Sequence, residues 1–327
     1  MAAPAQIRPA APAAIGLALT TIYLVWGSTY LAIAVMIDTM PPLLAAGIRY
    51  FTAGALVLAG LTIWKRVRHS RGVRFDRRQL GWAVVTAALL PVLGNGGVVL
   101  SLERIPTGVA ALIIATEPIL MALMEAVLDR RPPGRGVVVG AGAGLGGIIV
   151  LVAPWQGVGT IDPVGLMLCV GGAVAWSAGS ILTPRVGWSV SPPVVGGWQM
   201  LLGGGMLLVL GAAAGESTAA EWSSVSTTSI AALAYLILFG SIIAYSAYSW
   251  LLGHTRTSVV STFALVNPMV AVGLGAVVLG ERVGPQTAIA GAMILIAVVV
   301  ILASQARPAP IARRRQAVAV GSRQAEA

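Results

Sequence analysis

A run of 24 residues without a charged side chain extends from Ala13 to Met36, AAIGLALTTIYLVWGSTYLAIAVM. The hydrocarbon core of a bilayer is about 30 Å thick, and about 20 apolar helical residues cross it. The run is longer than the apolar core of a secretory signal peptide, so we expect it to stay in the chain as a first membrane helix. This stretch predicts a protein whose main solvent is lipid.

Nine further apolar windows follow the first one. The expected helices cover residues 13–36, 42–64, 80–102, 107–128, 136–152, 163–183, 193–213, 229–252, 258–279 and 286–304. The composition agrees, because 57% of the 327 residues are hydrophobic and only 10% are charged, against about 25% charged in soluble domains. The predicted fold class is an all-α polytopic membrane protein with ten transmembrane helices.

The basic residues are unevenly distributed among the loops. Eighteen of the 21 Lys and Arg residues lie in the tails or after the second, fourth, sixth and eighth helices, whereas only Arg104 and Arg282 lie in the opposite loops. Cytoplasmic loops carry an excess of Lys and Arg, so we expect both termini in the cytoplasm. The net charge of +10 then reflects topology, and no nucleic acid partner is expected. The predominance of Arg over Lys, with abundant Ala and Gly, suggests a GC-rich bacterial source and hence a plasma (inner) membrane.

The chain also aligns with itself at an offset of 150 residues. The offset matches Trp26 with Trp176, Arg49 with Gln199, Asn95 with Tyr245, and Glu117-Pro118 with Asn267-Pro268. Five helices per copy is an odd number, so the second copy must cross the membrane in the opposite direction, as in many secondary transporters with a site near the midplane. We expect a cytoplasmic tail at 1–12, a first five-helix repeat at 13–153, a second, inverted repeat at 163–304 and a basic cytoplasmic tail at 305–327.

Several short motifs occur along both copies. They are WGSTY at 26–30, PP at 41–42, RY at 49–50, GNG at 94–96, PTGVAAL at 106–112, VNP at 266–268 and LGER at 279–282. In their order and spacing they resemble the drug/metabolite transporter superfamily, in its EamA branch, over nearly all of the ten helices. The resemblance implies a ten-helix transporter, often an exporter of amino acids, metabolites or toxic compounds, in a superfamily that also includes lipid translocators.

Three ionisable side chains, Arg49, Glu117 and Glu125, fall well inside expected helices. Each costs about 2.5 to 3.5 kcal/mol or more if it faces lipid at the bilayer centre, so they should face the interior of the bundle. Glu117 lies midway along its helix and is our first candidate for a carboxyl group that binds substrate or exchanges protons. The alternative is that Glu117 or Glu125 forms a structural ion pair with Arg49.

Polar and aromatic residues of the same central layer could line a solute site, which needs apolar walls and a few convergent hydrogen-bonding groups. The predicted substrate-binding residues are Trp26, Ser28, Thr29, Tyr30, Asn95, Trp176, Gln199, Tyr245, Tyr248 and Asn267. Pro118 and Pro268 each remove a backbone donor in the middle of a helix. They are predicted hinges, with a kinked packing helix as the alternative.

The sequence holds little that catalysis requires. Its two histidines, His69 and His254, lie in loops, its single lysine is Lys65 and its single cysteine is Cys169. No HExxH pattern and no phosphate-binding loop ending in Gly-Lys-Ser/Thr occur. We therefore expect neither an enzyme nor a metal site nor a cofactor.

The favoured function is that of a secondary transporter. We expect it to export small organic solutes (amino acids, metabolites or drugs) by alternating access, with or without coupling to protons. A channel and a lipid or lipid-linked carrier flippase remain alternatives. The expected partners are a small-molecule substrate and membrane lipid, and the chain is expected to be a monomer or a homodimer.

Overall fold

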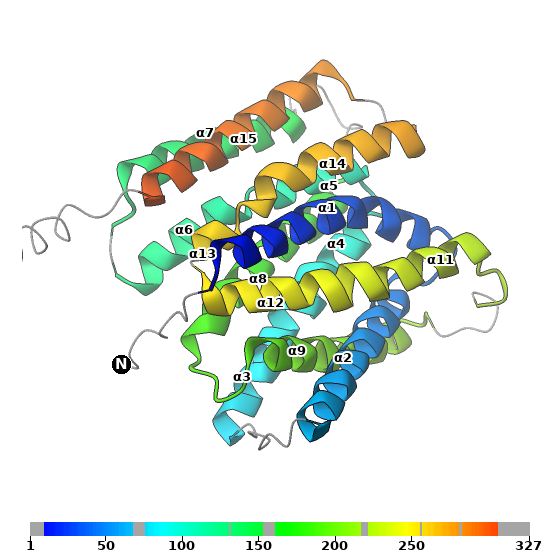
Figure 1. Ribbon diagram of the computed structural model, residues 1–327. Coiled ribbons are helices and arrows are strands. Elements are labelled where there is room, and N and C mark those ends of the chain that lie inside the picture. Colours follow the sequence, from blue (N-terminus) through cyan, green and yellow to red (C-terminus); the bar gives the residue numbers. More distant parts are fainter. Residues whose placement is uncertain are drawn as a thin grey trace, which may run out of the picture.

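The computed structural model describes residues 10–67, 76–130, 132–152, 161–216, 222–255, 257–280 and 283–306, and this part of the chain is helical without strands. The predicted tails fall mostly outside it, since residues 1–9 and 307–327 are not described. Both ends of the described chain lie on the same side of the bundle in Figure 1. We call this side the terminus face and the other side the opposite face.

The described residues form ten helical crossings, in two consecutive groups of five. The first group is α1 (Pro12–Ile37), α2 (Pro42–Val67), α3 (Arg77–Ala87) continued by η1 (Ala88–Asn95) and α4 (Gly96–Ser101), α5 (Thr107–Ile114) with α6 (Glu117–Leu128), and α7 (Arg135–Val152). The second group is α8 (Pro163–Arg185), α9 (Pro192–Ala213), α11 (Thr227–Tyr235) continued by η3 (Leu236–Ile243) and α12 (Ala244–His254), α13 (Thr257–Val260) with α14 (Phe263–Val278), and α15 (Pro285–Ala306). Seven of the crossings are long and apolar enough to span a bilayer by length and composition, and α14 and α15 contain shorter apolar stretches. The predicted ten-helix fold is thus confirmed, with boundaries shifted by a few residues.

The two groups are built alike. Each has a wide π-helical segment in its third crossing, η1 in the first group and η3 in the second. The fourth crossing of each is interrupted, between Ile114 and Glu117 in the first group and between Val260 and Phe263 in the second. Such features recur at a spacing close to the sequence offset, and because each group has five crossings, the groups are inverted-topology repeats.

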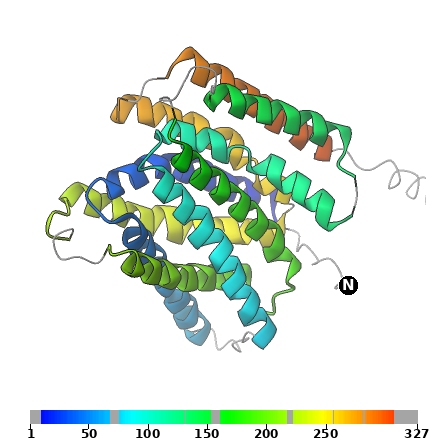
Figure 2. The same cartoon turned by 180° about the vertical axis from the view of Figure 1, so that it is seen from behind.

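Equivalent helices of the two repeats pack on each other. In Figures 1 and 2, α7 and α15 lie side by side along one edge of the bundle, and α2 packs against α9 near the opposite edge. The α2–α9 contact is tight, since a Cβ atom on Gly47 would lie 2.8 Å from the backbone nitrogen of Leu208, and one on Gly197 would lie 2.9 Å from Leu58 Cδ2. Glycine allows this close approach of helices in membranes. The two contacts are exchanged by the offset of 150 residues.

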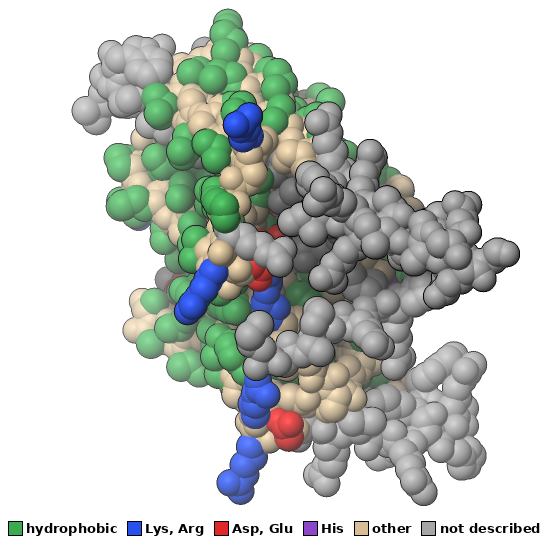
Figure 3. Space-filling model, turned by 90° about the vertical axis from the view of Figure 1, so that its left-hand side faces the viewer, with side chains coloured by type: hydrophobic (Ala, Val, Ile, Leu, Met, Phe, Trp, Pro, Cys, Tyr) green, Lys and Arg blue, Asp and Glu red, His purple; other side chains and the backbone are tan. Residues whose placement is uncertain are grey.

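The surface shows the same symmetry. The most exposed large apolar side chains, Val277 at 86% and Val127 at 77%, are again equivalent positions of the two repeats. In a soluble protein such exposure would be unfavourable, but next to lipid it costs nothing. The terminus face is different in character, because Arg side chains gather on it (Figure 3).

Candidate functional site

A cavity lies between the two repeats, with about 520 Å³ of space free of protein atoms when its opening to solvent is included. Its lining residues are Trp26, Thr29, Tyr30, Ile33, Arg49, Tyr50, Gly94, Asn95, Val98, Ile114, Glu117, Trp176, Phe263 and Asn267. They come from α1, α2, η1, α4, the two parts of the fourth crossing, α8 and α14. The cavity extends toward the opposite face, because Ile33 and Val98 lie close to the ends of α1 and α4 on that side (Figure 1).

The break between α5 and α6 places Glu117 at the cavity. The chain leaves α5 at Ile114, and the Thr116 hydroxyl donates to the carbonyl oxygen of Ile113 at 2.7 Å. Pro118 follows in the first turn of α6, where a missing N–H leaves no helical hydrogen bond unmade. The proline therefore starts a new helix, whereas Pro268 lies inside α14. The hinge role of both residues stays a prediction.

Arg49 is almost fully buried, with 2% of its surface exposed. Its Nε donates to the hydroxyl oxygen of Ser241 on η3 at 2.8 Å, and its guanidinium carbon lies 4.7 Å from the centre of the Tyr50 ring. Its Nη1 has no hydrogen-bond partner. The guanidinium group is thus held by the protein on one side and has donors left over on the other.

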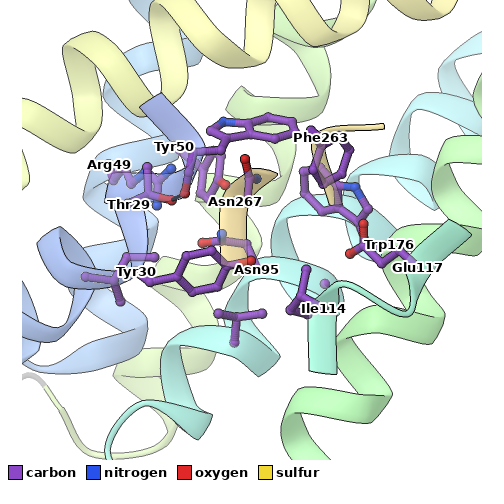
Figure 4. A pocket seen from close by; sticks show the side chains of 14 residues that line it. Thr29, Tyr30, Arg49, Tyr50, Asn95, Ile114, Glu117, Trp176, Phe263 and Asn267 are labelled. Carbon is purple, nitrogen blue, oxygen red and sulfur yellow. Dashed lines mark hydrogen bonds between the residues drawn. The ribbon is translucent and has the colours of Figure 1, made fainter. Parts of the chain in front are cut away.

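Glu117 is equally buried, at 2% exposure, and its Oε2 also lacks a hydrogen-bond partner. Ion pairs in the described part of the chain include Arg104–Asp162 and Arg185–Asp129, both at exposed sites. Figure 4 shows Arg49 and Glu117 on opposite sides of the cavity, with Asn95 and Asn267 between them. The expected alternative, in which Glu117 pairs with Arg49, is therefore not the arrangement of this structure.

Unsatisfied polar atoms concentrate at this cavity. Within the described residues, four buried side-chain atoms have no hydrogen-bond partner, and three of them, Arg49 Nη1, Asn95 Oδ1 and Glu117 Oε2, belong to cavity residues. Leaving a buried polar group unpaired costs about 1 to 3 kcal/mol, and more for a charged group. Such groups in a native structure call for an explanation. A polar ligand that binds in the cavity would supply the missing partners.

Aromatic rings close the cavity toward the terminus face. Trp26 contacts Trp176 edge to face at 5.6 Å between ring centres, and Phe263 in the same way at 5.2 Å. The indole nitrogen of Trp26 donates to the carbonyl oxygen of Gly240 at 3.1 Å, so a π-helical segment of the second repeat fixes this ring. Trp26 and Trp176, equivalent in the two repeats, therefore meet at the centre of the bundle.

The structure brings together most, but not all, of the predicted site residues. Eight line the cavity: Trp26, Thr29, Tyr30, Arg49, Asn95, Glu117, Trp176 and Asn267. Four of those predicted to bind substrate do not line it: Ser28, whose hydroxyl pairs with Tyr235 at 2.6 Å, and the buried Gln199, Tyr245 and Tyr248. The prediction missed Ile33, Tyr50, Gly94, Val98, Ile114 and Phe263. Apolar lining residues look like packing residues in a sequence, although Tyr50, next to Arg49, could have been inferred.

A bundle of inverted repeats around a central cavity with polar groups defines a membrane transport protein. The model of the EamA-like transporter family matches the chain twice, at residues 13–153 and 163–303. The chain belongs to this family. It is an integral inner-membrane protein and a transporter rather than an enzyme.

Similar proteins agree with the assignment. The chain is 34% identical over 286 residues to the uncharacterized inner membrane transporter YedA of Escherichia coli (strain K12), covering 87% of this chain and 89% of that protein. It is 25% identical to a probable amino-acid metabolite efflux pump of Salmonella typhimurium, covering 84% of this chain and 90% of that protein. A crystal structure with 20% sequence identity matches 91% of this chain and 100% of its own with a TM-score of 0.65, which supports the fold alone.

Proposed function

We propose that the protein exports small zwitterionic solutes of the amino-acid type that carry an apolar or aromatic side chain. The observation that carries the proposal is that Arg49 Nη1 and Glu117 Oε2 are both unpaired on one cavity and do not pair with each other. The carboxylate of the solute would bind the guanidinium group of Arg49, and the ammonium group of the solute would bind the carboxyl group of Glu117. Charge-assisted hydrogen bonds of this kind are about twice as strong as neutral ones.

The rest of the cavity suits such a solute. Its polar groups converge on one space from several helices, as they do in small-molecule sites. The rings of Trp26, Tyr50, Trp176 and Phe263 provide apolar walls, and aromatic faces also attract cationic groups. The printed name of the Salmonella relative, an amino-acid metabolite efflux pump, points in the same direction.

Export by alternating access would expose this cavity to each side of the membrane in turn, with the terminus face in the cytoplasm. Support for that orientation comes from described basic residues. The helix ends at or next to Arg77, Arg78, Arg130, Arg135 and Arg185 lie on the terminus face (Figure 1). Arg104 lies at the opposite face. This distribution follows the positive-inside rule.

Glu117 would couple export to protons. A carboxyl group that binds either the solute's ammonium group or a proton, but never both, exchanges one for the other. Solute would leave as a proton enters. In Glu117→Gln the proton site is removed, so a pH gradient should no longer drive solute export, whereas a solute gradient still drives slow exchange. Full pH-driven export by this variant would remove the carboxyl group from the coupling.

Three probes that share a phenyl ring test the substrate class. Purified protein in liposomes should exchange internal labelled phenylalanine for external phenylalanine, and much less for phenethylamine, which lacks the carboxylate, or 3-phenylpropionate, which lacks the amine. Equal exchange of all three would contradict the assignment of Arg49 and Glu117. Movement of a fluorescent phospholipid across the same membranes, with no amino-acid exchange, would establish a lipid flippase instead.

A further inference from the structure

The symmetry of the repeats relates the cavity to a second set of residues. Among the cavity residues on α1, α2, η1 and α4, five have an equivalent with a polar side chain that can form hydrogen bonds in the second repeat and outside the cavity: Tyr30, Ile33, Arg49, Asn95 and Val98. Adding 150 to each number gives Ser180, Thr183, Gln199, Tyr245 and Tyr248. We call these five the second polar set. Whereas the first five line an open cavity, none of the second five does.

The second polar set is closed on itself. All five side chains are buried, with exposures from 0% to 8%. The Gln199 amide nitrogen donates to the Thr183 hydroxyl at 3.2 Å, the Tyr245 hydroxyl donates to the Gln199 amide oxygen at 3.2 Å, and the hydroxyls of Ser180 and Tyr248 are hydrogen-bonded to each other. These polar groups are therefore satisfied by one another, unlike the unpaired atoms of Arg49, Asn95 and Glu117.

The set occupies the part of the bundle toward the terminus face. On α8, Ser180 and Thr183 lie between Trp176, which borders the cavity, and Arg185, the last residue of that helix. Arg185 pairs with Asp129, which follows α6, at 3.3 Å, where α8 and α6 end on the terminus face. The rings of Trp26 and Trp176 thus separate an open site on one side from a closed polar network on the other.

The central residues behave differently under the same symmetry. Trp26 and Trp176 are equivalent to each other, as are Glu117 and Asn267, and all four line the cavity. An exchange of the roles of the two repeats would therefore leave these four at the cavity. Arg49 would be replaced by Gln199, which is neutral.

We propose that the second polar set is the solute-binding site of the conformation that opens to the terminus face. The inference rests on the proposed function. In this conformation the hydrogen bonds within the set exchange for bonds to the solute, Glu117 keeps the ammonium group, and the carboxylate passes from Arg49 to Gln199 and neighbouring hydroxyls. Neutral donors hold a carboxylate less strongly than a guanidinium group does. The site open to the terminus face thus binds an amino-acid solute more weakly than the site described above.

Cysteine accessibility tests the site without a known solute. In a Cys169→Ala background, Thr183→Cys and its equivalent Ile33→Cys are treated with a membrane-impermeant maleimide in sealed vesicles of each orientation, the exposed face being identified by an N-terminal tag. Thr183→Cys should react only from the terminus face, and Ile33→Cys only from the opposite face. If Ile33→Cys reacts and Thr183→Cys reacts from neither face, the second polar set does not open and the proposal is wrong.

Side-specific transport tests the exchange of binding groups. The half-saturating phenylalanine concentration is measured from each face for the wild type, Arg49→Gln and Gln199→Ala. Arg49→Gln should raise it about tenfold or more from the opposite face and less than twofold from the terminus face, and Gln199→Ala should do the reverse. Glu117→Gln should affect both faces. If Arg49→Gln and Gln199→Ala each change both faces equally, one unchanging site serves both conformations.

The two tests separate two kinds of failure. If the wild type carries no phenylalanine, the proposed function fails, and maleimide labelling still decides whether the second polar set opens. If phenylalanine is carried but Thr183→Cys is unreactive from both faces, only the further inference fails.

Discussion

Close packing of α2 on α9 can be tested by adding a single methyl group to Gly204. A Cβ atom there would overlap the backbone nitrogen of Phe51 and would lie 2.7 Å from Phe51 Cα. Both atoms belong to the backbone of α2, so no side-chain rotation relieves the overlap, and the two helices must move apart. Overpacking of this kind typically costs about 1 to 3 kcal/mol. Gly204→Ala should therefore destabilise the protein by about that amount.

The neighbouring residue Gly205 provides a matched control. A Cβ atom on Gly205 would lie 3.9 Å from Phe51 Cδ2, an ordinary contact, and alanine is a better helix former than glycine by roughly 1 kcal/mol. Gly205→Ala should be neutral or slightly stabilising. Gly54 is the equivalent of Gly204 in the first repeat, and a Cβ atom on it would lie 2.8 Å from the carbonyl oxygen of Gly197. Gly54→Ala should therefore behave like Gly204→Ala.

The assay is thermal unfolding of the purified protein in detergent, followed by the loss of monodisperse protein. The account predicts lower midpoints for Gly204→Ala and Gly54→Ala than for the wild type, and an unchanged or higher midpoint for Gly205→Ala. Equal midpoints for Gly204→Ala and Gly205→Ala would refute the close contact. A loss for Gly204→Ala without a loss for Gly54→Ala would refute the symmetry of the contact.

Further predictions concern the opposite face, again with thermal midpoints as the measurement. Asp162 Oδ1 accepts a hydrogen bond from the Gly165 nitrogen at 2.7 Å as the N-cap of α8, so Asp162→Ala should lose about 1 kcal/mol or more. Arg104→Ala should lose less, because it breaks only an exposed ion pair of 3.8 Å; equal losses would contradict the capping role. The pKa of Glu103 is raised above its ordinary value, mainly by burial and to a lesser extent by the negative charge of the nearby Glu216. The positive charge of Arg104 acts in the opposite direction. An acid whose pKa is raised by folding reduces stability as the pH rises from the ordinary to the raised value. At pH values above that range, Glu103→Gln should therefore have a higher thermal midpoint than the wild type. At pH values below it, the two midpoints should be equal, and a difference that persists in acid would contradict this reasoning.

Much of the fold could be predicted from the sequence, because membrane helices are specified by apolar length and the repeats by a constant offset. The π-helical segments η1 and η3 were not predicted, since the apolar pattern does not reveal a change in backbone hydrogen bonding. The interruption of the fourth crossing was anticipated at Pro118. In the structure, however, the break precedes the proline, and in the second repeat it lies before Phe263 rather than at Pro268.

The site could be predicted less completely, for a reason that follows from symmetry. Arg49 and Gln199 occupy equivalent places in the two repeats, as do Asn95 and Tyr245, so the sequence predicted that all four lie in one central layer around the solute. In the structure the cavity includes Arg49 and Asn95 and leaves Gln199 and Tyr245 in a closed network. In the proposed mechanism, the conformation decides which repeat forms the open site. A sequence pattern does not display the free-energy difference between two packings of the same residues.

The central claim is that Arg49 binds the carboxylate of an amino-acid solute in the cavity. The most direct test is calorimetric binding of phenylalanine and phenethylamine to the wild type and to Arg49→Gln. The account predicts that phenylalanine binds the wild type at least tenfold more tightly than phenethylamine does, and that Arg49→Gln removes this difference while leaving phenethylamine binding unchanged. If Arg49→Gln weakens both ligands equally, or if phenylalanine keeps its advantage in the variant, Arg49 does not recognise the carboxylate and the claim is wrong.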